Sequence, residues 1–221
     1  LRPSLDLLNV LLLVTVIYAA ALQLVPLIFL PLTRGMIEKD TFSTPGSVFA
    51  TLTLGVAIGS ALLLLFSWSI GWLPKPLFGR QPVRGRWWMW FAPALVALPI
   101  LLRLFGIDYG AYSPAVIVIT FATGLLVGLS EELLVRGLVV EMLRRGGIAE
   151  WGTAAISSLM FALLHSTNAF TGQPLATVGA TLVYTFAFGV LMYLVMRVTG
   201  NLIWAVLLHG LTDPTSFLAN G

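Results

Sequence analysis

SPAVIVITFATGLLVGLSEELLVRGLVV, residues 113–140, is the stretch that decides the class of fold. It is apolar over more than the roughly 20 residues that a helix needs to cross a bilayer, although two acids and one arginine lie in its second half. The whole chain shares this composition: of its 221 residues, 58% are hydrophobic and 10% are charged, against about 25% charged in soluble domains. A soluble domain of this size has too little interior to bury so much apolar surface, so the sequence predicts a polytopic membrane protein.

Seven apolar stretches of this kind predict an all-α bundle of about seven transmembrane helices. The first is longer than the core of a signal peptide, so we expect a retained helix. The loops are short, and no separate soluble domain is expected. We expect residues 1–112 to form the first three membrane helices and residues 113–221 the last four, within one integrated membrane domain. The expected spans are 7–30, 47–73, 87–105, 113–140, 151–165, 175–198 and 201–218.

Positive charges in the loops predict the orientation in the membrane. Loops on one side carry most of the lysines and arginines, whereas those on the other side balance their few cations with acids. The basic side is therefore expected to be cytoplasmic, with the N-terminus inside, in the cytoplasmic membrane of a bacterium or archaeon. The net charge of +3 reflects these loops, so no nucleic-acid partner is expected. The basic-side residues are Lys75, Arg80, Arg84, Arg86, Arg144, Arg145 and Arg197.

Six ionisable residues, both histidines among them, lie in the expected spans away from the interfaces, where each costs at least about 2.5–3.5 kcal/mol. Glu132 and Arg136 are four residues apart with the acid first, which is the favourable order for a helical ion pair. Glu131 is turned by about 100° from Glu132 on a helix, so it cannot share that arginine and is left to face another group. His209 and Asp213 are also four residues apart, so the carboxylate can orient or charge the imidazole.

Three of these groups are expected to lie at one depth in the bilayer. Counted from the basic-side ends of their helices at about 1.5 Å per residue, Glu131 lies about 20 Å deep, His165 about 22 Å and His209 about 18 Å. Scattered structural polar residues have no reason to share a layer. We therefore interpret the set as one functional site.

Other features have ordinary structural interpretations. Asp213 precedes Pro214 and would be a good N-cap for a short final helix. Gly124 and Gly128 form a GxxxG pattern, which favours close helix packing. Phe161 taken alone is a core residue, and the tryptophans at residues 87–90 are typical of an interfacial belt.

Glutamate and histidine together in a low-dielectric cavity are suited to activating water. A buried carboxyl group can act as general base and then as general acid, one imidazole can hold the water, and a second can stabilise an oxyanion. This pattern indicates amide hydrolysis within the membrane. A zinc ion bound by Glu131, His165 and His209 is chemically acceptable as well. The chain has no HExxH, GxGD or GxSxG motif and no cysteine, which argues against other hydrolase classes.

In their order and spacing these residues resemble the CPBP (Abi) family, which comprises CAAX prenyl endopeptidases and bacteriocin-processing proteins. Three motifs carry the resemblance: Glu-Glu-x-x-x-Arg, Phe-x-x-x-His and His-x-x-x-Asn/Asp. It covers about residues 113–218 and leaves the first three spans unexplained. The matching residues are Glu131, Glu132, Arg136, Phe161, His165, His209 and Asp213.

The resemblance implies a role for each matching residue. Glu131 and His165 would activate the water, and His209 with the residue at 213 would form the oxyanion side. The second glutamate and the arginine of the first motif would support Glu131. The prenyl-endopeptidase branch has asparagine at the last position, whereas Asp213 can donate a hydrogen bond only when protonated. We therefore expect Asp213 to orient or charge His209.

The sequence thus predicts an intramembrane endopeptidase, either glutamate-dependent or a metalloprotease, that acts near the cytoplasmic side. Its expected partners are the bilayer and a membrane-associated, lipidated or small secreted peptide, and its cofactor is none or one zinc ion. One alternative is a catalytically silent scaffold or bacteriocin-immunity protein that binds a peptide or partner in the same cavity. Another is a proton-coupled transporter with Glu131 and the histidines as a relay, which the lack of an internal repeat disfavours.

Overall fold

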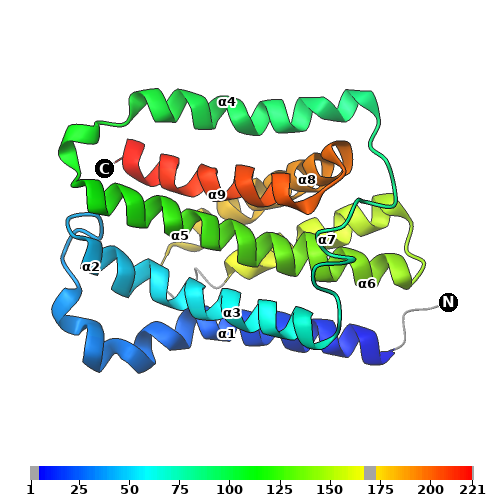
Figure 1. Ribbon diagram of the computed structural model, residues 1–221, viewed down its shortest axis with the longest axis horizontal. Coiled ribbons are helices and arrows are strands. Elements are labelled where there is room, and N and C mark those ends of the chain that lie inside the picture. The colour runs from blue at the N-terminus through cyan, green and yellow to red at the C-terminus, as the bar shows by residue number, and fades with distance from the viewer. Residues whose placement is uncertain (1–4, 167–172, 221) are drawn as a thin grey trace.

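The computed structural model describes residues 5–166 and 173–220, and every regular element in them is a helix (Figure 1). Six helical segments are long and apolar enough to cross a membrane, and another, α7 (Glu150–Leu164), is apolar but shorter. The predicted all-α membrane bundle is therefore confirmed, and the fifth expected span is the short one.

Some of the helices begin or end at residues that cap them. Ser113 accepts a hydrogen bond from the backbone N–H of Val116, and Asn201 accepts one from Ile203. Gly200 ends α8 at a φ of 77°, in the left-handed region that favours glycine. The α-helices are α1 (Leu5–Thr33), α2 (Pro45–Val48), α3 (Leu54–Ser69), α4 (Phe91–Gly106), α5 (Pro114–Glu132), α6 (Val140–Arg145), α7 (Glu150–Leu164), α8 (Leu175–Thr199) and α9 (Leu202–Ala219). The π-helical turns η2 (Phe49–Thr53) and η5 (Leu133–Val139) join α2 to α3 and α5 to α6, and 3₁₀ turns cover Arg34–Met36, Trp87–Trp90 and Tyr109–Ala111.

A central pair, α5 and α9, organises the bundle. The two helices share the most extensive helix contact of the described residues. In Figure 1, α4 lies on one side of this pair, and α1 and α3 lie on the other. α7 packs on α8, and both α4 and α8 contact α9. The central pair is therefore covered by neighbours on several sides, as a site within a membrane requires.

Small residues allow the close approach of α5 and α9. A Cβ atom on Gly128 would lie 2.5 Å from the carbonyl oxygen of Val206 and 2.6 Å from the backbone nitrogen of Gly210. A Cβ atom on Gly124 would lie 2.5 Å from the carbonyl oxygen of Gly210. The helix-packing role predicted for the GxxxG pattern is confirmed.

The break expected at Pro214 is wrong. α9 is one continuous helix, and its N-cap is Asn201 rather than Asp213. Pro214 lacks the N–H that would bond the carbonyl oxygen of Gly210, and that oxygen packs against Gly124 instead. The helix therefore continues through the proline, because the neighbouring glycine leaves room for the freed carbonyl group.

The two ends of the bundle differ in composition. All seven tryptophans of the chain lie at the end where α3 stops and where α4, α7 and α9 begin. Most of them are exposed, as is usual for tryptophan at a membrane interface. The basic loops lie at the same end, which we call the tryptophan end. The tryptophans are Trp68, Trp72, Trp87, Trp88, Trp90, Trp151 and Trp204.

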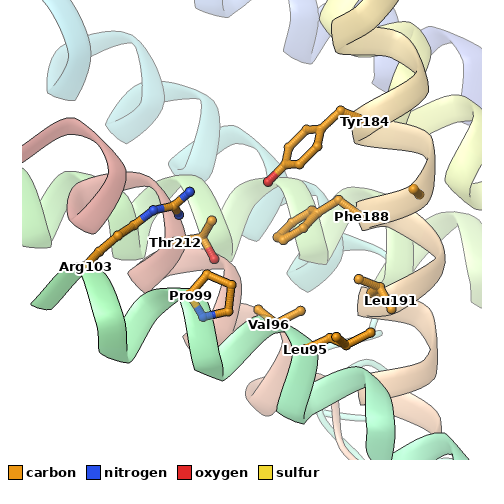
Figure 2. A pocket seen from close by; sticks show the side chains of 9 residues that line it. Leu95, Val96, Pro99, Arg103, Tyr184, Phe188, Leu191 and Thr212 are labelled. Carbon is orange, nitrogen blue, oxygen red and sulfur yellow. The ribbon is translucent and has the colours of Figure 1, made fainter. Parts of the chain in front are cut away.

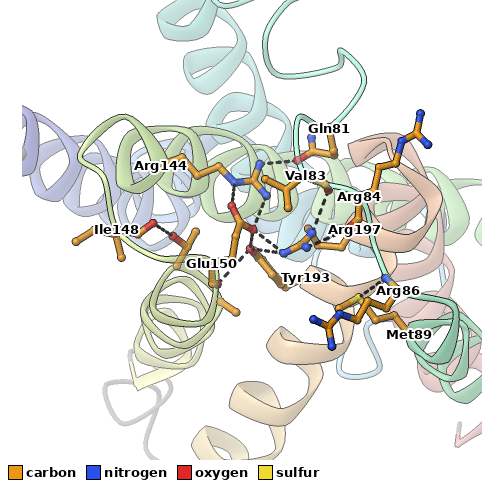
Figure 3. Close-up of polar contacts among 12 residues, drawn as sticks. Gln81, Val83, Arg84, Arg86, Met89, Arg144, Ile148, Glu150, Tyr193 and Arg197 are labelled. Atoms are coloured by element: carbon orange, nitrogen blue, oxygen red, sulfur yellow. Dashed lines mark hydrogen bonds and ion pairs between the residues drawn. The ribbon is translucent and has the colours of Figure 1, made fainter. Parts of the chain in front are cut away.

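A charged cluster holds the helices together at the tryptophan end (Figure 3). Glu150, the first residue of α7, pairs with Arg144 of α6 at 2.8 Å and with Arg197 of α8 at 2.6 Å. Tyr193 of α8 donates its hydroxyl group to the same carboxylate. One acid thereby fixes the ends of three helices.

The two arginines of this cluster also hold the loop between α3 and α4. Arg144 donates to the side-chain oxygen of Gln81 at 2.7 Å. Arg197 donates to the carbonyl oxygens of Val83 at 3.1 Å and Arg84 at 3.0 Å. The basic loop is therefore fixed to the bundle by its backbone, and Figure 3 shows the Arg84 side chain directed away from the cluster.

The close packing of α5 on α9 predicts that Gly128→Ala destabilises the protein. The added methyl group would clash with the backbone of α9, so we expect the free energy of unfolding to fall by about 1–3 kcal/mol. Denaturant unfolding of the protein in detergent micelles measures the change. The matched control is Gly179→Ala in α8, because a Cβ atom at Gly179 meets nothing within 4 Å. If both variants are as stable as the wild type, the packing described for Gly128 is incorrect.

Candidate active site

A buried ion pair lies at the centre of the bundle. Nη1 of Arg136 is 3.1 Å from Oε1 of Glu132, and both side chains are fully buried. The pair spans the junction between α5 and the π-helical turn η5. Such turns are frequent at functional sites. The pairing predicted from the four-residue spacing is confirmed.

Arg136 also connects α5 to two other helices. Its Nη2 atom donates to the carbonyl oxygen of Gly189 in α8 at 3.0 Å. Its guanidinium lies over the ring of Phe161 in α7, 4.4 Å from the ring centre. A Cβ atom on Gly189 would lie 3.1 Å from Nη2 of Arg136, so a small residue there lets the arginine reach the backbone of α8.

Glu132 orients the first of the two histidines. Its Oε1 atom accepts a hydrogen bond from Nδ1 of His209 in α9 at 2.8 Å, so this oxygen serves both His209 and Arg136. The sequence spacing predicted that Asp213 orients or charges His209. In the described residues Nδ1 of His209 donates its hydrogen bond to Glu132 and not to Asp213, whereas Asp213 lies within electrostatic range of the imidazole.

Glu131 is the acid without a cation of its own, as the sequence predicted. Its Oε2 atom lies 3.8 Å from Nε2 of His209, which is longer than a hydrogen bond. This oxygen is buried and has no hydrogen-bond partner in the described part of the chain. A buried carboxylate oxygen without a partner is costly, so a water molecule or a substrate group is the expected occupant of the space beside it.

His165 ends α7 beside the same cluster. Its Nδ1 atom lies 3.0 Å from the carbonyl oxygen of Phe161, and its ring packs edge-on against the Phe161 ring at 4.9 Å. The His209 ring packs edge-on against the same phenyl ring at 5.6 Å. Both histidines lie within electrostatic range of Glu131. The structure thus brings Glu131 and both histidines together, with the Phe161 ring in contact with the two imidazoles.

Asp213 lies one helical turn beyond His209 and faces a cavity. The cavity has a volume of about 200 Å³ and lies between α1, α3, α5 and α9. Thr123 and Gly124 of α5 also line it. Asp213 is within electrostatic range of Glu131 and of His209, although it bonds to neither. Its oxyanion role stays a prediction.

Two residues of the site were missed in the sequence. Tyr18 of α1 is 2% exposed, and its hydroxyl group lies 2.8 Å from Oγ of Ser130, the residue before Glu131. Phe188 of α8 packs against the His209 ring at 5.1 Å. Tyr18 carried a usable signal, because a tyrosine in the middle of a span lies away from the interface where tyrosine is usually enriched.

The side chains predicted to bind zinc do not fit a metal ion. In residues 5–166 and 173–220, no group of three or more His, Asp or Glu side chains is placed to hold one. His209 and His165 use Nδ1 for Glu132 and the Phe161 carbonyl group respectively, so Nε2 is the ring nitrogen that each has left, and the two do not converge with a carboxylate on one ion position in the described residues. We therefore derive no step through a metal.

Comparison with known proteins identifies the segment that contains this site. Residues 113–215, a little under half of the chain, match the family model of type II CAAX prenyl endopeptidases, Rce1-like. The match begins at the N-cap of α5 and contains Glu131, His165 and His209. The family resemblance predicted from the three motifs is confirmed. No curated protein and no solved structure gave a significant match.

The geometry predicts that Arg136→Leu is strongly destabilising. It leaves Glu132 buried without its cation, so we expect the free energy of unfolding to fall by about 3–5 kcal/mol. Arg145→Leu is the matched control, because it breaks a pair with Glu141 that has the same four-residue spacing on α6 but a 51% exposed arginine. Arg145 also lies over the ring of Trp72, 4.5 Å from the ring centre, so we expect that control to lose at most about 1.5 kcal/mol. Equal losses in denaturant unfolding would contradict the central role of the buried pair.

Proposed function

We propose, from the membership of its residues 113–215 in the Rce1-like CAAX prenyl endopeptidase family, that this integral membrane protein hydrolyses a peptide bond with water activated by Glu131. The observation that carries the proposal is the buried, unpartnered Oε2 atom of Glu131, which lies 3.8 Å from an oriented imidazole. A carboxylate oxygen held in this way is suited to act as a general base.

His165 is suited to hold the same water. A carbonyl oxygen can only accept a hydrogen bond, so Nδ1 of His165 carries the proton in its contact with the Phe161 carbonyl group. The neutral ring then presents Nε2 as an acceptor. Water has two protons to donate, and Glu131 and His165 would accept one each. The lone pairs of the water oxygen then remain free to attack a carbonyl carbon.

His209 is suited to stabilise the oxyanion. Glu131 and Glu132 together carry two negative charges beside one arginine, so the cluster is neutral when His209 is protonated. Neutrality is favoured in a low-dielectric interior, where an uncompensated charge is expensive. A protonated His209 donates through Nδ1 to Glu132 and has Nε2–H left to donate to the oxygen of a tetrahedral intermediate.

These roles give a balanced hydrolysis. Glu131 takes a proton from water as the water oxygen bonds to the scissile carbonyl carbon, and the carbonyl oxygen becomes the oxyanion held by His209. Collapse of the intermediate breaks the carbon–nitrogen bond. Glu131 then passes its proton to the leaving nitrogen and returns to the carboxylate form.

The substrate is proposed to be a membrane-associated or lipidated protein, or a small secreted peptide, cleaved from the cytoplasmic side. The tryptophan end carries the basic loops, which supports a cytoplasmic location for that end and for the N-terminus. Glu131 lies 13 residues before Arg144, or about 20 Å along the helix from that end. The scissile bond of a substrate must therefore reach well below the membrane surface.

This proposal predicts that Glu131→Gln abolishes cleavage and preserves binding. Loss of the general base should lower kcat/KM by about 10²- to 10⁴-fold, because glutamine cannot accept the water proton. The measurement uses purified protein in detergent and a panel of membrane-anchored peptides, a prenylated CAAX peptide among them, with mass spectrometry of the products. Glu141→Gln is the matched control, since Glu141 lies on the same helical segment in a surface pair.

Further results bear on the mechanism. We expect His165→Ala to lower kcat more than it raises KM, and we expect cleavage by the wild type to resist a chelator. Loss of cleavage on chelation with rescue by zinc would overturn the metal-free mechanism.

Binding of a peptide without cleavage by the wild type would favour a catalytically silent scaffold. Full activity of Glu131→Gln would exclude Glu131 as the base.

A further inference from the structure

A groove lies on the outside of the bundle between α4, α8 and α9 (Figure 2). Its volume is about 270 Å³, and most of its wall is apolar. Glu131, Glu132, His165 and His209 do not line it. The groove therefore adjoins the candidate active site only through Phe188 and does not include its acids or histidines. The apolar wall consists of Leu95, Val96, Pro99, Ala187, Phe188 and Leu191.

Three polar side chains gather at one part of this groove. Arg103 of α4, Tyr184 of α8 and Thr212 of α9 line it, and Figure 2 shows the Arg103 guanidinium and the Tyr184 hydroxyl group directed toward a shared space. The Thr212 hydroxyl group already donates to the carbonyl oxygen of Leu208 at 2.9 Å. Arg103 and Tyr184 have no hydrogen-bond or ion-pair partner for their side chains among residues 5–166 and 173–220, so their donors are available.

The depth of Arg103 places its charge near a membrane surface. It lies 16 residues after Trp87, about 24 Å along α4 from the tryptophan end, and three residues before the helix ends at Gly106. Leu95 lies eight residues before it, about 12 Å deeper along the same helix. The groove thus runs from the level of lipid head groups into the hydrocarbon layer.

An unpaired guanidinium beside an apolar groove is suited to one class of ligand. Arginine binds phosphate in a bidentate manner, and the tyrosine hydroxyl can add a further donor. An acyl chain would cover the apolar wall below. We propose that this groove binds a single phospholipid, with its phosphate on Arg103 and one acyl chain along Leu95 and Phe188.

The lipid would lie directly behind the candidate active site. Phe188 forms part of the groove wall and also packs against the His209 ring at 5.1 Å. Phe188 stacks on Tyr184 with ring centres 6.2 Å apart. A bound chain would therefore support the aromatic side chain that holds His209, without entering the space beside Glu131.

Native mass spectrometry of the full chain in detergent tests the proposal. The probes are phosphatidylglycerol, diacylglycerol with the same chains, and inorganic phosphate. We expect the wild type to retain one phosphatidylglycerol, and Arg103→Gln to bind it about tenfold more weakly because a charge-assisted hydrogen bond is lost. Arg34→Gln is the matched control, since Arg34 lies exposed at the same end of the bundle, outside the groove. Diacylglycerol and phosphate alone should bind at least tenfold more weakly than the intact lipid.

A second variant tests the acyl chain with the arginine intact. Ala187→Leu narrows the groove wall, so we expect phosphatidylglycerol binding to fall by about tenfold, with Arg103 and the unfolding temperature unchanged. Equal lipid retention by the wild type, Arg103→Gln and Ala187→Leu would overturn the proposal. Displacement of the lipid by a prenylated peptide would also overturn it and would make the groove a substrate subsite. Peptide cleavage is not needed for either readout, so the lipid site stands or fails independently of the proposed hydrolysis.

Discussion

The buried pair of Glu132 and Arg136 is the constraint on which the rest of the structure depends. Neither group can be left alone in a membrane interior, because an unpaired charge there is too expensive. The two charges pair across one helical turn. The same Glu132 oxygen also bonds to His209 in α9, and Nη2 of Arg136 reaches the Gly189 carbonyl group in α8. The stacked ring of Phe161 adds α7. A single ion pair therefore sets the relative positions of four helices.

Two neighbouring glutamates consequently have different tasks. Glu132 has its charge shared between an arginine and an imidazole, so it is fixed and suited to a structural role. Both glutamates keep a buried Oε2 atom without a hydrogen bond, but only Glu132 is held through its other oxygen, whereas Glu131 points elsewhere on the helix. The π-helical turn η5 begins directly after Glu132. The structural acid and the proposed general base are thus adjacent in sequence and separated only by the rotation of the helix.

Part of this arrangement could be predicted from the sequence because it depends on spacing within one helix. The Glu132–Arg136 pair and the leftover Glu131 follow from the 3.6-residue period, and the common depth follows from helix rise. The partner of His209 depends on how α9 is rotated against α5, and spacing along α9 alone does not determine that rotation. The continuity of α9 through Pro214 depends on a glycine in another helix. Tyr18 and the groove around Arg103 likewise arise only from contacts between helices distant in sequence.

The central claim is that Glu132 stabilises the fold, whereas the adjacent Glu131 acts as the general base. The most direct measurement compares Glu131→Gln and Glu132→Gln for both unfolding temperature and single-turnover cleavage rate. We expect Glu131→Gln to keep or raise the unfolding temperature while it loses cleavage, because its Oε2 atom has no hydrogen bond to lose and His209 can release its proton to keep the cluster neutral. We expect Glu132→Gln to lower the unfolding temperature, because Arg136 and His209 lose the charge of their shared acceptor. A lower unfolding temperature for Glu131→Gln together with a stable Glu132→Gln variant would contradict this division.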